Sequence, residues 1–139
     1  MIERSDPRRF SARMSALPEI LGCVRQACQD AGIVAPAALR VELVIEELFT
    51  NTVRHGYRGE CDHPVWLHAL PAPGRLCLTY QDAATAFDPL AVRPDPGRAA
   101  PHCPGGQGIH LVCALVSSIA YRRADERNLL TLLFAAAPG

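Results

Sequence analysis

Residues 44–57 read VIEELFTNTVRHGY, and this stretch carries the clearest structural pattern in the chain. The pattern starts after Pro36, a residue suited to the first turn of a helix, and stops at Gly56, a common helix end. On a wheel of about 100° per residue one side is an apolar stripe. Its members are Val41, Ile45, Leu48, Phe49 and Thr52. The sequence therefore predicts a packed helix from Pro36 to about His55.

A second row on this helix is polar. Glu47, Asn51 and Arg54 follow at i, i+4 and i+7, and most such rows are solvated faces. Leu43 and Val44 flank Glu47, however, so the helix is apolar on most sides. A carboxylate and an amide oxygen one turn apart suit a magnesium ion that also binds water and substrate phosphate, with the carboxylate as a general base. The pair alone is a weak indication, because such strings arise by chance.

The remaining predicted strands and helices precede and follow this helix along the chain. Turn residues and apolar periodicity predict the order strand, helix, helix, strand, strand, long loop, helix, strand, strand. Their ranges are 8–15, 18–32, 36–55, 65–70, 76–82, 83–104, 109–116, 118–123 and 128–135, with a short turn around Asp125 and Glu126. Loops as long as 83–104 are often functional lids. Hairpins with inserted helices predict a two-layer α+β sandwich with the helices on one sheet face.

Composition limits the classes of function. The 139 residues carry 14 basic and 14 acidic side chains, and a neutral chain is poorly suited to holding nucleic acid or an anionic membrane. No stretch approaches the roughly 20 apolar residues of a membrane span, and residues 1–10 lack the apolar run of a secretory signal. All the basic residues are arginine, which excludes a Walker A loop and Schiff-base catalysis. We expect one cytoplasmic domain, residues 1–139.

Six cysteines, at 23, 28, 61, 77, 103 and 113, are best explained as small buried hydrophobes. No two of them have the CxxC spacing, and the paired spacing of a structural zinc site is missing. The hypothesis of a metal-sensing or redox-sensing protein has only the number of cysteines in its favour.

Two further parts of the sequence are candidate ligand-binding sites. Asp82 ends a strand whose core-facing row is Leu76, Leu78 and Tyr80. It either begins the following turn or accepts hydrogen bonds from an exocyclic amine, such as that of adenine. Three glycines, Gly105, Gly106 and Gly108, directly precede an apolar helix. They form either a phosphate cradle at the helix N-terminus or a flexible hinge.

In this order the three motifs resemble the Bergerat ATP-binding fold of gyrase, the histidine kinases and the anti-sigma-factor serine kinases. VIEELFTNTVRHGY, FDPL after Asp82, PGGQGIHLV and RNLLTL are similar in order and spacing to the anti-sigma regulatory factors. The resemblance covers residues of about 10–135. It implies a histidine-kinase-like ATPase domain, with a mixed sheet covered by about three helices on one face and an ATP lid at 83–104.

The resemblance also assigns roles to residues. Asn51 corresponds to the magnesium-binding asparagine, Glu47 to the catalytic base and Asp82 to the adenine-binding aspartate. Thr131 is similar to a threonine that supports the adenine pocket. The remaining nucleotide-binding positions are His55 and Gly56, just past the magnesium site, and the phosphate-loop glycines Gly105, Gly106 and Gly108.

One position departs from the family pattern. Family members usually have Asp-x-Gly after the adenine-facing strand, whereas QDAATAFDPL (81–90) has Ala84 in place of that glycine. If the position requires φ > 0, alanine costs about 1 kcal/mol or more and weakens nucleotide binding.

The resemblance implies an ATP-dependent protein serine/threonine kinase. It would use Mg²⁺ and ATP to phosphorylate a serine on an anti-sigma-factor antagonist protein and so control sigma-factor availability. The alternative, which Ala84 favours, is a non-catalytic module of the same fold that binds a sigma factor or an antagonist with weak or no turnover. A histidine kinase fragment fits less well, because nothing upstream resembles a phospho-accepting helix. Family members are often dimers, so a homodimer is expected, with no direct nucleic-acid or membrane partner.

Overall fold

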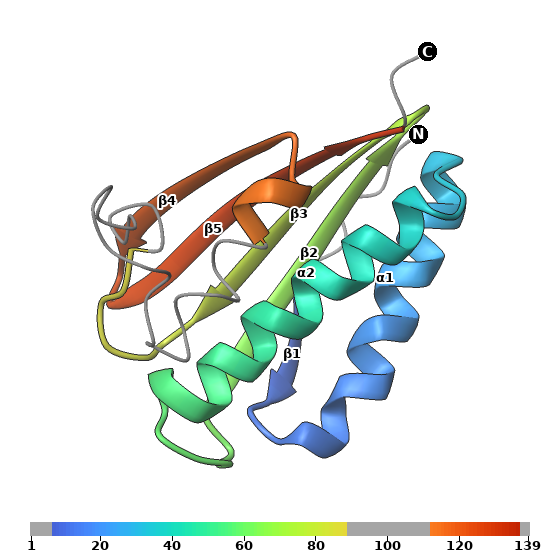
Figure 1. The fold of residues 1–139 in the computed structure, drawn as a ribbon. Coiled ribbons are helices and arrows are strands. Elements are labelled where there is room, and N and C mark those ends of the chain that lie inside the picture. The colour runs from blue at the N-terminus through green and yellow to red at the C-terminus, as the bar shows by residue number, and fades with distance from the viewer. Residues whose placement is uncertain (1–6, 89–111, 137–139) are drawn as a thin grey trace, which may run out of the picture.

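The computed structural model describes residues 7–88 and 112–136, which form a five-stranded sheet with helices packed on one face (Figure 1). The strands lie in the order β1-β2-β3-β5-β4, so β3 is the central strand. This two-layer α+β arrangement confirms the predicted fold class. The bounds of the elements are β1 Arg8–Ser11, α1 Leu17–Ala31, α2 Ala37–Asn51, β2 Pro64–Ala72, β3 Arg75–Asp82, β4 Ser118–Ala124 and β5 Arg127–Ala135.

Every pair of neighbouring strands in the described residues is antiparallel, which corrects the expectation of a mixed sheet. The reason is the pair of helices between β1 and β2. A single crossover helix would return the chain parallel to β1, whereas α1 and α2 together reverse it once more. β4 runs in the direction of β3, but β5 lies between them. Of the third predicted helix, 109–116, the described part is a helical turn at 112–115.

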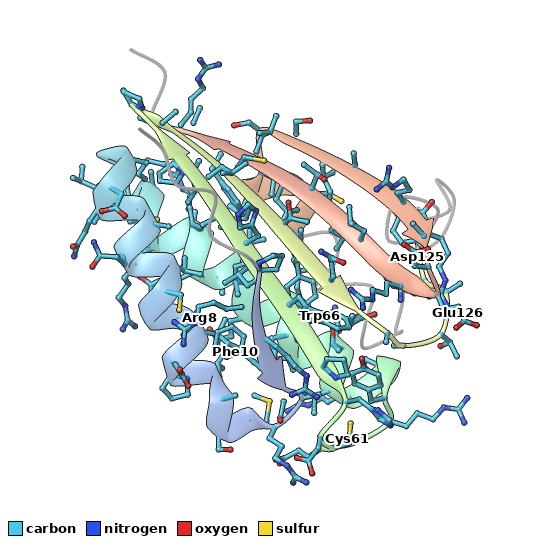
Figure 2. All side chains as sticks on the ribbon, turned by 180° about the vertical axis from the view of Figure 1, so that it is seen from behind. Arg8, Phe10, Cys61, Trp66, Asp125 and Glu126 are labelled. Carbon is cyan, nitrogen blue, oxygen red and sulfur yellow. The ribbon has the colours of Figure 1, made fainter. Side chains whose placement is uncertain are left out.

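The core lies between the sheet and the two helices. Alternate residues of each strand face this layer, and in β3 these are Leu76, Leu78, Tyr80 and Asp82, all buried as predicted. The predicted stripe of the second helix is also confirmed, because all its members are buried: Val41, Ile45, Leu48, Phe49 and Thr52. The turn between β4 and β5 is made by Asp125 and Glu126, with φ of 52° and 60° (Figure 2).

The end of α2 is wider than an α-helix. Residues Thr52–Gly56 form a π-helical turn, and the backbone N–H of Tyr57 donates to the carbonyl of Thr52 at 2.8 Å, five residues back. The helix therefore reaches Gly56 as expected, but its last turn has a different hydrogen-bond pattern. Such turns are rare and frequently lie at functional sites.

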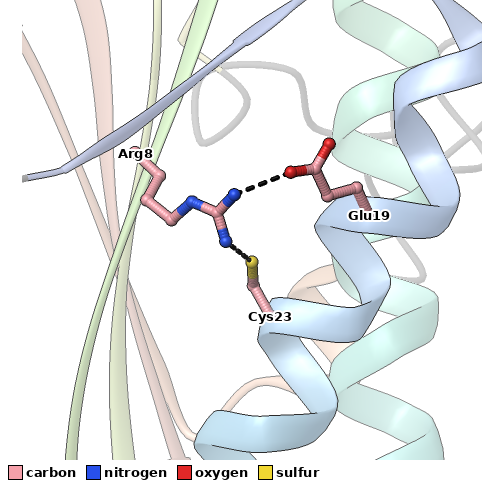
Figure 3. Close-up of polar contacts among 3 residues, drawn as sticks. All are labelled: Arg8, Glu19 and Cys23. Carbon is pink, nitrogen blue, oxygen red and sulfur yellow. Dashed lines mark hydrogen bonds and ion pairs between the residues drawn. The ribbon is translucent and has the colours of Figure 1, made fainter.

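The edge strand β1 is attached to α1 through one side chain. Arg8 donates to Glu19 Oε1 at 2.7 Å and to Cys23 Sγ at 2.8 Å (Figure 3). Its guanidinium also lies 5.2 Å from the ring centroid of the buried Phe10. Both members of the Arg8–Glu19 pair are exposed, so the pair adds little stability, and the apolar contacts of Phe10 hold the strand.

Two classes of feature are missing from the described residues. Within 7–88 and 112–136 no group of three His, Cys, Asp or Glu side chains is arranged to hold a metal ion. None of the helices in these ranges is long and apolar enough to cross a membrane.

Candidate functional site

Asp82 lies at the end of the central strand and points into the layer between the sheet and the helices. The residue is 8% exposed. Thr52 donates to its Oδ2 (Oγ1–Oδ2 2.8 Å), while Asn128 (Nδ2–Oδ1 2.9 Å) and the backbone N–H of Ala84 (N–Oδ1 3.2 Å) donate to its Oδ1. A carboxylate has about four acceptor positions. Donors from the described residues fill three, so one position on Oδ2 remains for a further donor.

Thr52 links Asp82 to the start of the π-helical turn. Its Oγ1 lies 2.7 Å from the hydroxyl of Tyr80 as well as 2.8 Å from Asp82 Oδ2. A threonine has one hydroxyl proton, and the charge-assisted bond to Asp82 is the stronger use of it, so Tyr80 donates to Thr52. Burial, and secondly the negative charge of Asp82, raise the pKa of Tyr80 well above its ordinary value, which keeps this donor protonated.

Asn128 faces Asp82 across the β3–β5 pairing. The two residues are direct partners in the register, and their side chains emerge on the helix side of the sheet. The same asparagine donates to the carbonyl of Thr85 at 2.9 Å, and Arg123 donates to the carbonyl of Ala84 at 2.8 Å. Residues from β4 and β5 therefore hold the segment that follows Asp82.

Gly56 and Tyr57 hold the same segment from the other side. A Cβ at Gly56 would lie 3.0 Å from the Cβ of Ala84, so the glycine makes room for the alanine methyl group. Tyr57 accepts from the N–H of Ala83 at 2.8 Å and donates to the carbonyl of Pro64 at 2.7 Å, and burial raises the pKa of its hydroxyl. Ala84 has no positive φ, so the strain considered from the sequence does not arise.

Asn51 and Glu47 lie one turn apart on α2, next to this network. Asn51 directly precedes Thr52, and its Nδ2 is buried without a hydrogen-bond partner among the described residues. Glu47 is half-buried, while the neighbouring Leu43 is 37% exposed. A buried amide nitrogen that has no partner among the described residues, beside a carboxylate site, fits a donor role toward an oxygen of a ligand. One amide oxygen also suits Mg²⁺, which keeps most of its ligands as water and substrate phosphate.

The other predicted site residues divide into three groups. His55 is exposed, beside the buried network rather than in it. Thr131 is not brought to Asp82, because it pairs with Thr79 and its side chain lies on the opposite face of the sheet from Asn128. The glycines Gly105, Gly106 and Gly108 lie outside the described residues, as does most of the predicted lid at 83–104.

The sequence assigned no role in the site to Asn128 and Tyr57, nor to Thr52 and Tyr80, which it placed only in core-facing rows. The signal for Tyr57 was its place in the HGY string. The signal for Asn128 was an asparagine at the start of a mainly apolar strand, and the pairing of β3 with β5 places it directly across from Asp82.

Comparisons with known proteins agree with this geometry. Residues 10–134 match the histidine kinase-like ATPase domain family. No curated protein sequence matches the chain. The structure of the RsbU and RsbW domains of Rv1364c from Mycobacterium tuberculosis is similar, with a TM-score of 0.60, 16% identity and 94% of this chain covered.

The chain spans only 32% of the length of that mycobacterial structure. The histidine kinase AdeS of Acinetobacter baumannii is also similar, with a TM-score of 0.50 and 15% identity over 98% of this chain and 70% of that one. At these identities the structural likeness shows the fold alone. The match to the family extends over nearly the whole chain, and an ATPase domain implies nucleotide binding. The chain belongs to the histidine kinase-like ATPase domain family.

Proposed function

We propose that residues 1–139 form a single domain that binds Mg-ATP beside α2 and the end of β3. The observation that carries this proposal is the buried carboxylate of Asp82, which has three donors among the described residues and one acceptor position on Oδ2 that none of them fills. The exocyclic amine of adenine would fill that position. A site built to hydrogen-bond an amine discriminates strongly against bases that lack one.

The residues at the C-terminal end of α2 would act on the phosphates. Asn51 would hold Mg²⁺ through its Oδ1 together with phosphate oxygens, and its buried Nδ2, which has no partner among the described residues, would donate to a phosphate oxygen. His55 and Gly56 lie just beyond it, and the glycines at 105, 106 and 108 would surround the triphosphate with backbone N–H groups. The segment 83–104 would form the lid of the nucleotide site.

Glu47 would be the general base of a phosphoryl transfer. It stands one helical turn from Asn51, on the same face of α2, so its carboxylate would lie near a phosphate held at Asn51. The hydroxyl oxygen of a protein serine would attack the γ-phosphorus, its proton would pass to the Glu47 carboxylate, and ADP would leave. The similarity to a structure that joins RsbU and RsbW domains supports a place in a regulatory pathway. We therefore propose an anti-sigma-factor antagonist or a sigma factor as partner, and a homodimer as the working form.

The second candidate is a non-catalytic module that binds the same kind of partner with weak or no turnover. Backbone strain at Ala84 would favour this module. Ala84 has no positive φ, however, and its methyl group occupies space left by Gly56, so this strain is absent. The kinase is therefore the better supported of the two functions.

Calorimetric titration of ATP, with and without Mg²⁺, tests the nucleotide site. We expect Mg²⁺-dependent binding that Asn51→Ala abolishes and that Asp82→Asn weakens at least tenfold, because the amide presents a donor where the amine needs an acceptor. The exposed Asp62→Asn is the matched control for the aspartate. Absence of binding at millimolar ATP by the unaltered protein would refute the proposal.

Transfer of ³²P from ATP to candidate antagonist proteins tests the catalytic role. Glu47→Gln should bind ATP with unchanged affinity and lose transfer by a factor of about 10²–10⁴, the range for a general base. Glu46→Gln, next to it on the exposed side of the helix, is the control. Binding without transfer by the unaltered protein would favour the non-catalytic module.

A further inference from the structure

The face of the sheet opposite the two helices is positively charged (Figure 2). Among the strand residues that the structure describes, Asp82 is the one acidic residue, and it points toward the helices. The opposite face therefore has no carboxylate on its strands. Its arginines are Arg9, Arg75, Arg122 and Arg127.

Strand pairing arranges part of this face into a row that crosses the whole sheet. We call it the basic row, and its five members, each the direct partner of the next from β1 to β4, are Arg9, Trp66, Gln81, Leu129 and Arg122. Neighbouring strands lie about 4.8 Å apart, so the row is about 19 Å long. It therefore presents an aromatic and an apolar side chain between two arginines.

The arginines at the two ends of the basic row have no ion-pair partner among the residues that the structure describes. Arg9 donates to the backbone carbonyl of Asp62 at 2.8 Å, whereas the carboxylate of Asp62 is paired with Arg13. Arg127 adds a third positive charge, because its guanidinium lies 3.8 Å from the ring centroid of Trp66. Such a surface attracts ligands that carry carboxylates.

We propose that the basic row is the docking surface for an acidic segment of a partner protein. The segment is an extended stretch of about six residues, with carboxylates at both ends and apolar side chains between them, and its length of about 20 Å matches the row. Its carboxylates pair with Arg9 and Arg122, and its apolar side chains pack on Trp66 and Leu129. This surface is separate from the proposed nucleotide site, because Asp82 points to the other face of the sheet.

The charge pattern argues against two other occupants. A second copy of this chain, packed face to face, would bring arginines against arginines with no strand carboxylate to pair with them, and burial of unpaired charges is costly. Sheets that bind single-stranded nucleic acid stack several bases on aromatic side chains. On this face of the described strands Trp66 is the one Phe, Tyr or Trp residue, and Arg127 already occupies one side of its ring.

Tryptophan fluorescence tests the proposal at the site itself, because Trp66 is the only tryptophan in the chain. The probe is the peptide Glu-Glu-Leu-Leu-Glu-Glu with both ends blocked, and its neutral counterpart has Gln in place of each Glu. We expect the acidic peptide to change the emission of Trp66 saturably and the neutral peptide to bind about tenfold more weakly. Raising the ionic strength from about 0.1 M to about 1 M, which shortens the Debye length from about 10 Å to about 3 Å, should also weaken the acidic peptide about tenfold.

Arginine variants show whether the peptide binds at the basic row. Arg9→Gln and Arg122→Gln should each weaken binding by about two- to fivefold, and the double variant by about tenfold. Arg75→Gln is the matched control, because it removes the same charge from the same face at the opposite end of β3 from Gln81. It should leave the affinity unchanged. All three arginines are exposed, so the variants should fold as the unaltered protein does.

Four results would overturn the proposal. The first is an unchanged Trp66 emission at millimolar acidic peptide, and the second is equal weakening by Arg75→Gln and Arg9→Gln, which would indicate non-specific attraction. The third is tighter binding of an oligothymidylate than of the peptide, which would make nucleic acid the occupant. The fourth is an emission that changes with protein concentration alone, which would make a second copy of the chain the occupant.

Discussion

Substitution of Gly56 by alanine tests the close approach of α2 to the segment after β3. A Cβ at position 56 would lie 3.0 Å from the Cβ of Ala84, whereas favourable carbon contacts lie at about 3.5–4.0 Å. Ala84 is 5% exposed, and its methyl group is attached directly to the backbone, so it cannot rotate away. We therefore expect Gly56→Ala to destabilise the protein, although alanine is the better helix former.

The magnitude follows from two opposing effects. Gly56 has no positive φ, so alanine adds no backbone strain and should gain about 0.5–1 kcal/mol through its lower conformational freedom in the unfolded chain. Insertion of a methyl group into a filled space costs about 1–3 kcal/mol. The net expectation is a loss of about 1 kcal/mol. In an Ala84→Gly background the obstacle is gone, so the same change should become stabilising.

Urea unfolding followed by far-UV circular dichroism measures this on the unaltered protein, the two single variants and the double variant. Together these four proteins form a double-mutant cycle, which should give a coupling free energy of about 1–3 kcal/mol between positions 56 and 84. Gly22→Ala is the matched control, because Gly22 lies in α1 with no heavy atom within 4 Å of the added Cβ. It should stabilise the protein by about 0.5–1 kcal/mol.

Stabilisation of the protein by Gly56→Ala, as by Gly22→Ala, would contradict the close approach of positions 56 and 84. So would a coupling free energy below about 0.5 kcal/mol, the level at which independent sites add.

Three further predictions concern the network around the site. Tyr57→Phe removes a hydroxyl with two hydrogen bonds and should lower the free energy of unfolding in urea by about 1–3 kcal/mol; a change below about 0.5 kcal/mol would contradict its role. The pKa of Tyr80 is raised in the folded state above the ordinary 10.0, so its contribution to stability is complete below that pH and is lost as pH rises beyond it. Urea unfolding from pH 10.0 upward should show this decline, and Tyr80→Phe should flatten it. Thr52→Val should weaken ATP binding about tenfold in calorimetry, while Thr131→Val should change it less than twofold; equal effects would refute the assignment of Thr52.

The elements of the fold were predictable because their signals are local. Apolar periodicity and turn residues gave a first strand of the central hairpin at 65–70 and a second at 76–82, and the structure has β2 at Pro64–Ala72 and β3 at Arg75–Asp82. The antiparallel direction of β1 relative to β2 could not be predicted from local signals. It depends on how α1 and α2 pack against each other, and single-chain periodicity carries no information about that.

The site was predictable only in part, for a related reason. Asp82 could be placed because β3 alternates cleanly between apolar and polar residues. In β5 leucines occupy both faces, so the sequence does not show that Thr131 points away from Asp82 while Asn128 points toward it. Their positions depend on the pairing of strands that are distant in the sequence. The π-helical turn was not predictable either, because its residues also suit an α-helix.

The partners of Asp82 also determine when the site forms during folding. Thr52 lies 30 residues before Asp82 and Asn128 lies 46 residues after it, so both long loops must close before the carboxylate has its donors. A chain that has paired β2 with β3 but not yet β5 holds an incomplete binding site. A nucleotide would then recognise only the finished sheet. Bound nucleotide would slow unfolding and leave the folding rate unchanged, so it would stabilise the native state kinetically.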